Sequence, residues 1–137
     1  MELSIIIVNY NTRPYLAQCL AALTATTTVP HEIIIVDNHS TDDSVPWLHS
    51  LNRPRLRVIF NRENLGYAAA CNQGLALATG RYLVTMNPDV RTPPRWAERL
   101  IWHLKQHPLT LMVGPKSPGI GGRQWAGPRS FSRHLPA

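Results

Sequence analysis

The sequence predicts an α/β protein built around a doubly wound, mostly parallel β-sheet. Apolar runs of strand length alternate along the chain with segments whose apolar residues recur at helical spacing, in the order β-α-β-α-β-α-β-α-β. Three of these runs, at residues 4–8, 33–36 and 82–86, are followed at once by Asn or Asp. Open α/β sheets bind ligands at the carboxyl ends of their strands, so the same pattern predicts a binding site there.

The first half of the chain predicts two buried strands, each followed by a helix. Residues 4–8 are a continuous apolar run that is rich in isoleucine, which is typical of a strand covered on both faces. Thr12 can cap the helix that follows this strand. Residues 33–36 form the second strand, and we expect a short helix to open after it at Ser40 or Thr41.

The second half of the chain predicts three more strands and two more helices. Residues 56–60 are less apolar than the first two strands, so this third strand is expected nearer an edge of the sheet. The helix at residues 67–78 consists largely of small residues, which let it lie close to the sheet, and Gly80 is expected to end it. The remaining elements are a strand at 82–86, a helix opened by the proline pair 93–94, and a fifth strand at 109–113.

Length and charge predict one domain followed by a basic tail. A chain of 137 residues suffices for one domain with a core. Residues 1–98 hold eight basic and eight acidic side chains, whereas residues 99–137 hold six Lys or Arg and no acid, so the net charge of +6 belongs to the C-terminal part. We expect a domain over residues 1–113 and an irregular, basic, Gly- and Pro-rich tail over residues 114–137.

Several functional classes lack support in the sequence. The basic tail can contact nucleic acid, anionic lipid or substrate phosphates, but no recognition helix or zinc-ligand spacing indicates a nucleic-acid partner. No dinucleotide-binding glycine motif or phosphate-binding P-loop is present. Cys19 and Cys71 are distant from each other and predict buried thiols in a reducing compartment. No signal peptide or membrane-spanning run is found, so we expect a cytoplasmic protein.

Asp37 and Asp89 are the carboxylates at strand ends with the most chemical potential. Asp37 can accept hydrogen bonds from a ribose hydroxyl or a base N–H, but Asp also favours turns and helix caps, and both interpretations stay open. Asp89, after Asn87 and Pro88, can hold Mg²⁺ or Mn²⁺ together with substrate phosphates. A simple Asn-Pro-Asp turn is the alternative, and the residues alone favour that turn.

Five motifs occur in a fixed order along the chain, at residues 4–11, 35–44, 61–68, 72–74 and 78–89. Their order and spacing resemble those of family 2 glycosyltransferases, the inverting enzymes with the GT-A fold. The form of the motifs looks most like the branch that includes rhamnosyltransferases of bacterial surface polysaccharides. The resemblance covers roughly residues 3–113 and implies the Rossmann-like, nucleotide-binding half of the GT-A fold, incomplete at its C-terminus.

The resemblance implies a role for each matching residue. The positions around the nucleotide-sugar are Asn9, Tyr10, Asp37, Asn64, Gly66, Asn72 and Asn87. Asn87 stands at the first position of the family's D-x-D element and Asp89 at the last, where the family holds Mg²⁺ or Mn²⁺ on the donor diphosphate. The metal neutralises charge that builds up on the departing nucleoside diphosphate.

The resemblance also implies a reaction and its partners. The donor is expected to be a nucleoside-diphosphate sugar, UDP- or dTDP-linked, and the acceptor a saccharide or a lipid-linked molecule in polysaccharide biosynthesis of the cell envelope. The location would be the cytoplasm, with peripheral association at the inner face of the membrane. Inverting transfer needs a general base, and no Asp or Glu follows Glu98. We therefore expect a truncated donor-binding half that is inactive alone; the alternative is a non-catalytic nucleotide-binding module whose partner chain supplies the acceptor half.

Overall fold

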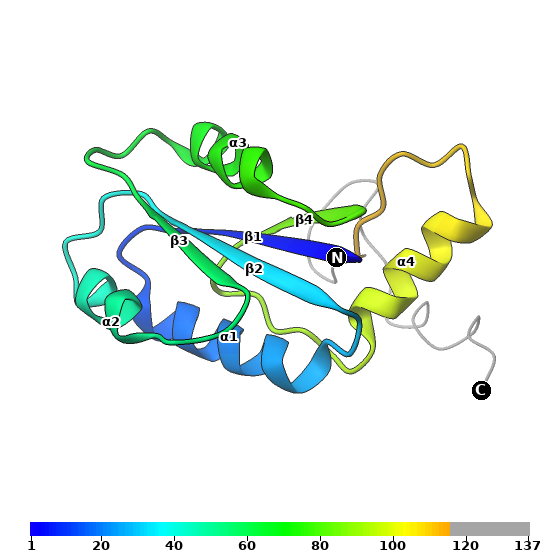
Figure 1. The fold of residues 1–137 in the computed structure, drawn as a ribbon, viewed down its shortest axis with the longest axis horizontal. Coiled ribbons are helices and arrows are strands. Elements are labelled where there is room, and N and C mark those ends of the chain that lie inside the picture. The colour runs from blue at the N-terminus through cyan, green and yellow to red at the C-terminus, as the bar shows by residue number, and fades with distance from the viewer. Residues whose placement is uncertain (116–137) are drawn as a thin grey trace, which may run out of the picture. The chain divides into compact units, whose positions relative to one another are not determined.

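A computed structural model describes residues 1–115, and it shows a four-stranded parallel sheet with helices on both faces (Figure 1). The strands are β1 (Leu3–Asn9), β2 (His31–Asp37), β3 (Leu56–Phe60) and β4 (Tyr82–Met86). The helices are α1 (Arg13–Thr26), α2 (Ser44–Ser50), α3 (Tyr67–Leu77) and α4 (Trp96–Gln106). The chain divides into two compact units, Met1–Arg99 and Leu100–Ala137, and each is described by itself.

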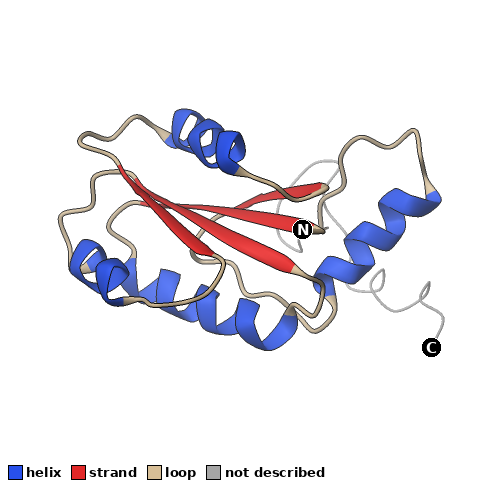
Figure 2. Ribbon diagram, viewed as in Figure 1, coloured by secondary structure: helices blue, strands red, loops and turns tan. Residues whose placement is uncertain are grey.

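The sheet in the first unit has the strand order β3-β2-β1-β4, and every pair is parallel. The most apolar strands, β1 and β2, lie at its centre, where all residues of β1 are buried. Helix α3 covers one face of the sheet, and α1 and α2 cover the other (Figure 2). The predicted doubly wound, parallel sheet is therefore confirmed, as is the position of β3 at an edge.

Small residues bring α3 close to the sheet, as predicted. A Cβ atom at Gly74 would lie only 2.5 Å from Cγ2 of Ile6 in β1. The role of Gly80 differs from the prediction, because α3 already ends at Leu77. A Cβ atom at Gly80 would lie 2.5 Å from the backbone nitrogen of Ser4, so this glycine lets the entry to β4 pass directly against β1.

Two predicted elements differ in the structure. The fifth strand expected at residues 109–113 is not formed, and the side chains of Leu109 and Leu111 there are 96% and 97% exposed. A short apolar run becomes a strand only when a neighbouring strand pairs with it, and residues 100–115, the described part of the same unit, hold no other strand. Helix α2 begins at Ser44, later than predicted, because the preceding residues form a loop bonded to the β1–α1 connection.

The C-terminal part is described only as far as residue 115. The predicted irregular tail at 114–137 lies mostly outside the described residues, and the boundary after residue 113 stays a prediction. Within residues 1–115, no helix is both long enough and apolar enough to cross a membrane.

Glu32 lies in a polar network on the α3 face of β2, near the amino end of the sheet. Its carboxylate is 6% exposed and accepts hydrogen bonds from the Ser4 hydroxyl (2.6 Å), the Thr79 hydroxyl (2.7 Å) and the Thr79 backbone N–H (2.8 Å). The Arg57 guanidinium donates to its other oxygen at 2.6 Å. Burial alone raises the pKa of Glu32, but these bonds outweigh burial and lower the pKa from 4.5 to about 2.

This network makes the stability of the fold depend on pH below 5. Because folding lowers the pKa of Glu32, its contribution is fully present above the unfolded pKa of 4.5 and is lost as pH falls towards 2. We expect Glu32→Gln to lower the free energy of unfolding by about 2 kcal/mol at pH 7, measured by urea unfolding followed by circular dichroism. The difference from the wild type should shrink between pH 4.5 and about 2. A difference that stays constant over this range would contradict the assignment.

Candidate functional site

The carboxyl ends of the parallel strands bring the predicted polar residues to one end of the sheet. β1 ends at Asn9 and β2 at Asp37, and these two residues are paired in register. On the other side of β1, the last residue of β4, Met86, is level with Ile7. Strands β2 and β4 are therefore about 10 Å apart, two strand spacings, and β4 ends two residues earlier than β2.

Asn9 and Asp37 form a buried hydrogen-bonded pair at the base of this site. Asn9 is 0% and Asp37 is 1% exposed. The Asn9 amide donates to Oδ2 of Asp37 at 2.8 Å, and the backbone N–H of Ser40 donates to Oδ1 at 2.9 Å. Both carboxylate oxygens thus accept hydrogen bonds from within the protein. This is the turn-forming role of Asp37, one of the two interpretations that the sequence left open. The role of Asp37 towards a nucleoside stays a prediction.

The loops after β1 and β2 are tied to each other by side chains. Asn11 has φ of 55°, and its side-chain oxygen accepts hydrogen bonds from the backbone N–H groups of Thr41 (2.7 Å) and Asp42 (3.2 Å). The prediction that Thr12 caps α1 with its side chain is wrong, because its hydroxyl makes no hydrogen bond to the first turn of the helix. Its hydroxyl instead donates to the side-chain oxygen of Asn9 at 2.7 Å. Beside this rigid pair of loops, Tyr10 is 47% exposed and accessible to a ligand.

Asn38 connects this pair of loops to the loop between β3 and α3. Its side chain is 2% exposed and donates to the side-chain oxygen of Asn64 at 2.7 Å. Its own oxygen accepts from the Leu65 backbone N–H and the Asn61 amide, both at 3.0 Å. The sequence analysis did not single out Asn38. The available signal was its place directly after a strand, shared with the predicted residue Asp37.

Asn64 and Gly66 lie where this connection is exposed at the surface. The Gly66 backbone N–H donates to the Asn64 side chain at 2.9 Å, and Gly66 has φ of 80°, a conformation that glycine adopts readily. Residues 62–69 are all exposed, so this loop and the start of α3 are accessible to a ligand. Asn72 is exposed on α3. Its predicted role near the nucleotide-sugar stays a prediction.

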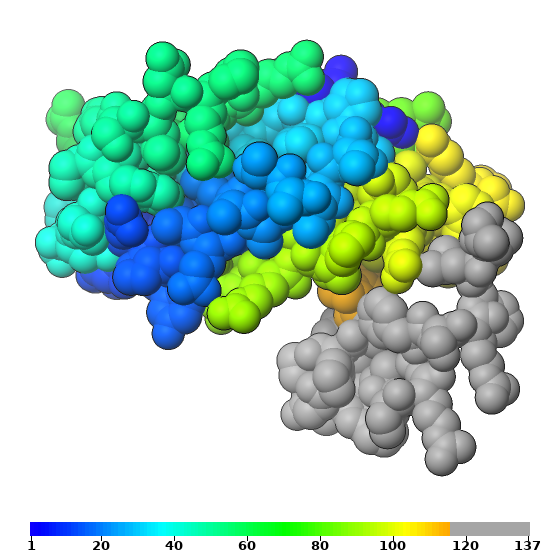
Figure 3. All heavy atoms as spheres, turned by 90° about the horizontal axis from the view of Figure 1, so that it is seen from below, coloured from blue at the N-terminus to red at the C-terminus, as the bar shows by residue number. Residues whose placement is uncertain are grey.

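Asp89 lies in the segment that follows β4, and this segment is held along α1 (Figure 3). The hydroxyls of Thr92 and Thr26 are 2.7 Å apart, and the Trp96 indole donates to the Thr27 hydroxyl at 3.0 Å. Asn87 and Asp89 are both exposed. Burial first, and then the negative charge of Asp89, raise the pKa of the Cys19 thiol to about 11, so Cys19 is an unreactive buried thiol at neutral pH.

The oxygen ligands available fit a cation held mainly by a substrate. Within residues 1–115 no group of three or more His, Cys, Asp or Glu is placed to hold a metal. Asp89 offers one exposed carboxylate, and Asn87 adds an amide oxygen. Mg²⁺ is commonly bound by one or two carboxylates together with substrate phosphates and water. The donor set therefore fits Mg²⁺ or Mn²⁺ on a diphosphate, and it does not fit a closed, all-protein metal site.

The structure is a parallel α/β sheet with tied, polar loops at the carboxyl ends of its strands, which is the end where open α/β sheets bind ligands. The sequence matches the family model described as "Glycosyl transferase family 2" over residues 4–135. The chain belongs to this family, as the sequence motifs had implied. Residues 1–115 form a four-stranded sheet with flanking helices, which is the nucleotide-binding part of the GT-A fold.

Similarity to individual proteins agrees with the family. The chain is 28% identical to an uncharacterised glycosyltransferase of Haemophilus influenzae, covering 89% of this chain and 41% of the relative. It is 27% identical to the N-acetylglucosaminyl-diphospho-decaprenol L-rhamnosyltransferase of Mycobacterium tuberculosis, covering 82% of this chain and 40% of the relative. The crystal structure of S. aureus TarS 1-349 has the same fold, with a TM-score of 0.71 at 23% identity over 89% of this chain and 39% of TarS. The chain thus spans about 40% of the length of these relatives.

Proposed function

We propose that this chain binds a nucleoside-diphosphate sugar at the carboxyl ends of its strands, for inverting transfer of the sugar to a saccharide or lipid-linked acceptor. The observation behind the proposal is that side chains tie together the loops after β1, β2 and β3, while Asp89 follows β4 as an exposed carboxylate. Asn9, Asn11 and Asn38 connect these loops through their side chains. Loops that the protein itself holds in place cost less to order when a ligand binds.

The proposed donor is UDP- or dTDP-linked. TarS, which shares the fold, has crystal structures in complex with UDP-GlcNAc and with UDP. By the family resemblance, Asn9, Tyr10 and Asp37 surround the nucleoside. Tyr10 would offer its half-exposed ring to the base, and the buried Asp37 would hold the loop beneath it. Asn64, Gly66 and Asn72 would lie along the sugar-bearing side, where the start of α3 is exposed.

Asp89 is proposed to hold Mg²⁺ or Mn²⁺, with Asn87 beside it. When bound, the metal would neutralise charge on the departing diphosphate. The contribution of the chain is the position of the carboxylate, because the segment after β4 is fastened to α1 through Thr92 and Trp96. An exposed carboxylate without an arginine or lysine ion pair among residues 1–115 keeps its charge available for a cation.

The acceptor side of the reaction rests on the relatives. The name of the Mycobacterium tuberculosis relative gives N-acetylglucosaminyl-diphospho-decaprenol as the molecule on which that enzyme acts, which supports a lipid-linked acceptor. Residues 99–137 contain no carboxylate, so none of them is proposed as the general base. We place the reaction in the cytoplasm, with peripheral association at the membrane where a lipid-linked acceptor would lie. A non-catalytic nucleotide-binding module that needs a partner chain for the acceptor half is the second candidate, because the chain spans only 41% and 40% of the Haemophilus influenzae and Mycobacterium tuberculosis relatives.

Thermal unfolding with nucleotides tests the donor proposal. In the presence of Mn²⁺, we expect UDP or dTDP at about ten times its dissociation constant to raise the melting temperature by about 4 °C. ADP and inorganic phosphate serve as controls and should raise it less. A melting temperature that none of UDP, dTDP or GDP changes at millimolar concentration would contradict a donor site in this chain.

A further inference from the structure

A basic groove lies at the opposite end of the sheet from the candidate donor site. It is formed where β2 and β3 begin and where α1 ends, and it encloses about 370 Å³, a volume within the range of small-ligand sites. β2 runs from His31 in this groove to Asp37 in the donor site. Six residue steps of about 3.3 Å separate the two ends, so the groove lies about 20 Å from the donor site.

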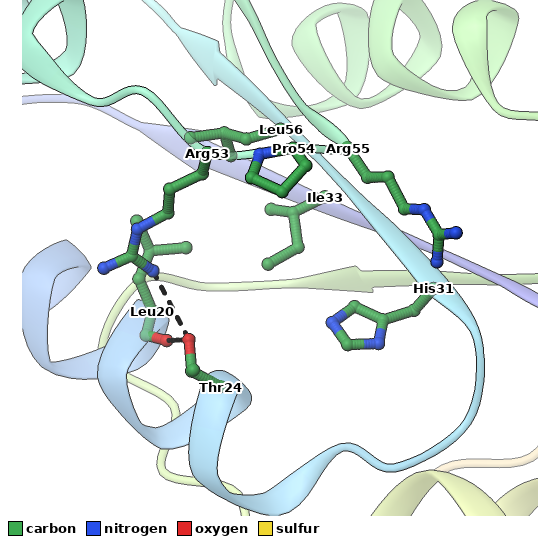
Figure 4. A pocket seen from close by; sticks show the side chains of 8 residues that line it. All are labelled: Leu20, Thr24, His31, Ile33, Arg53, Pro54, Arg55 and Leu56. Atoms are coloured by element: carbon green, nitrogen blue, oxygen red, sulfur yellow. Dashed lines mark hydrogen bonds between the residues drawn. The ribbon is translucent and has the colours of Figure 1, made fainter.

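The groove combines an apolar floor with a positively charged rim (Figure 4). Leu20 and Ile33 are 1% and 8% exposed and form the floor. Arg53 and Arg55 extend on its two sides, and the ring of His31 lies between Arg55 and α1. Pro54, Leu56 and Thr24 complete the lining, which contains no carboxylate. The neighbouring acid, Glu32, faces the other side of the sheet, where Arg57 pairs with it.

The two arginines are positioned by the fold. Arg53 donates to the Thr24 hydroxyl at 3.3 Å, and this hydroxyl donates in turn to the Leu20 carbonyl at 2.8 Å, so the guanidinium is fastened to α1. Arg55 has φ of 63°, in the left-handed region that residues other than glycine rarely adopt. Its carbonyl accepts a hydrogen bond from the Ile33 backbone N–H at 2.9 Å, which fixes the backbone at this position. Among residues 1–115, neither guanidinium has a carboxylate partner.

We infer that this groove binds a small amphiphilic anion, a phosphate monoester with a short apolar chain. The Arg55 guanidinium would hold the phosphate, because arginine donates paired hydrogen bonds to phosphate oxygens, and Arg53 on the opposite side of the groove would add positive charge. The apolar chain would cover Leu20 and Ile33, which form the floor. The site is separate from the donor site and does not depend on the proposed transferase function.

Titration of hexyl phosphate into the isotopically labelled chain, followed by NMR, tests this inference. We expect saturable shifts at the amides of Thr24, Ile33 and Arg55, and binding about tenfold tighter than that of inorganic phosphate, because part of the hexyl chain is buried. Arg53→Gln combined with Arg55→Gln should weaken hexyl phosphate binding at least about tenfold. Arg62→Gln, which removes the same charge at the other end of the sheet, should leave it unchanged.

The outcomes separate the ligand chemistry and its source. Equal binding by the double variant, no preference over inorganic phosphate, or shifts confined to the donor end would each overturn the inference. Co-sedimentation with phosphatidic acid vesicles, lost in the double variant and retained in Arg62→Gln, would assign the ligand to a lipid headgroup. Binding of hexyl phosphate without vesicle binding would assign it to a soluble phosphate ester.

Discussion

Replacement of Asp37 by alanine is expected to lower the free energy of unfolding by about 3 kcal/mol, a large effect for one side chain at the surface end of a strand. The carboxylate is 1% exposed and accepts hydrogen bonds from the Asn9 amide and the Ser40 backbone N–H. Its removal leaves both donors without their acceptor at a site that water reaches poorly. Urea unfolding at pH 7, followed by circular dichroism, measures the loss.

Two variants make this measurement specific. Asp37→Asn keeps one acceptor oxygen but directs an N–H group at a donor, so we expect a loss of about half that of Asp37→Ala. Asp43→Ala removes a carboxylate that is 72% exposed and 3.6 Å from Arg13, and it should cost less than about 1 kcal/mol. A loss for Asp37→Ala no larger than that for Asp43→Ala would show that the buried pair does not stabilise the site.

Replacement of Asn38 by alanine is expected to loosen the loop that carries Asn64 and Gly66. The Asn38 side chain holds this loop through hydrogen bonds with Asn64 and the Leu65 backbone N–H, and their loss should cost about 2 kcal/mol. The free energy is lost locally, so amide hydrogen exchange of residues 61–66 should become faster than in the wild type.

The matched control is Asn72→Ala, an exposed asparagine on α3. We expect it to change stability by less than about 0.5 kcal/mol and to leave exchange in residues 61–66 unaltered. Nucleotide binding should fall in Asn38→Ala even where the fold is intact, because the loop must then be ordered on binding. Unchanged exchange in Asn38→Ala would contradict the role of this residue as the connection between loops.

The strands and their parallel arrangement were predictable because their signals are local. Continuous isoleucine and valine runs in β1 and β2 predict strands buried on both faces, and the weaker run of β3 predicts an edge. The run at residues 109–113 has similar apolarity but forms no strand, since pairing depends on a neighbour that local sequence does not specify. The role of Gly80 could not be predicted for the same reason, because its close approach to Ser4 is a contact between segments that are distant in the sequence.

The meeting of the loops after β1, β2 and β3 was predictable, whereas the hydrogen bonds between them were less so. The motif order implied that Asn9, Asp37, Asn64 and Gly66 lie around one ligand, and the structure brings the loops that carry them together. Their contact with a nucleotide-sugar stays a prediction. Composition cannot tell a polar residue that holds loops from one that contacts a ligand, since Asn and Asp suit both. Asn11 and Asn38 therefore went unnoticed, although their side chains connect the loops. The predicted site residues that are exposed, and so accessible to a ligand, are Tyr10, Asn64, Gly66, Asn72, Asn87 and Asp89.

Calorimetric titration of UDP, dTDP and GDP, with and without Mn²⁺, tests the central claim that Asp89 and these loops form a metal-assisted donor site. The wild type is expected to bind one of these nucleotides, and Mn²⁺ should tighten binding about tenfold or more. Asp89→Asn should lose the Mn²⁺ effect while its melting temperature stays unchanged, and Asp43→Asn should keep the effect. Mn²⁺-dependent binding that is equally strong in Asp89→Asn, or no binding by the folded wild type, would contradict the account.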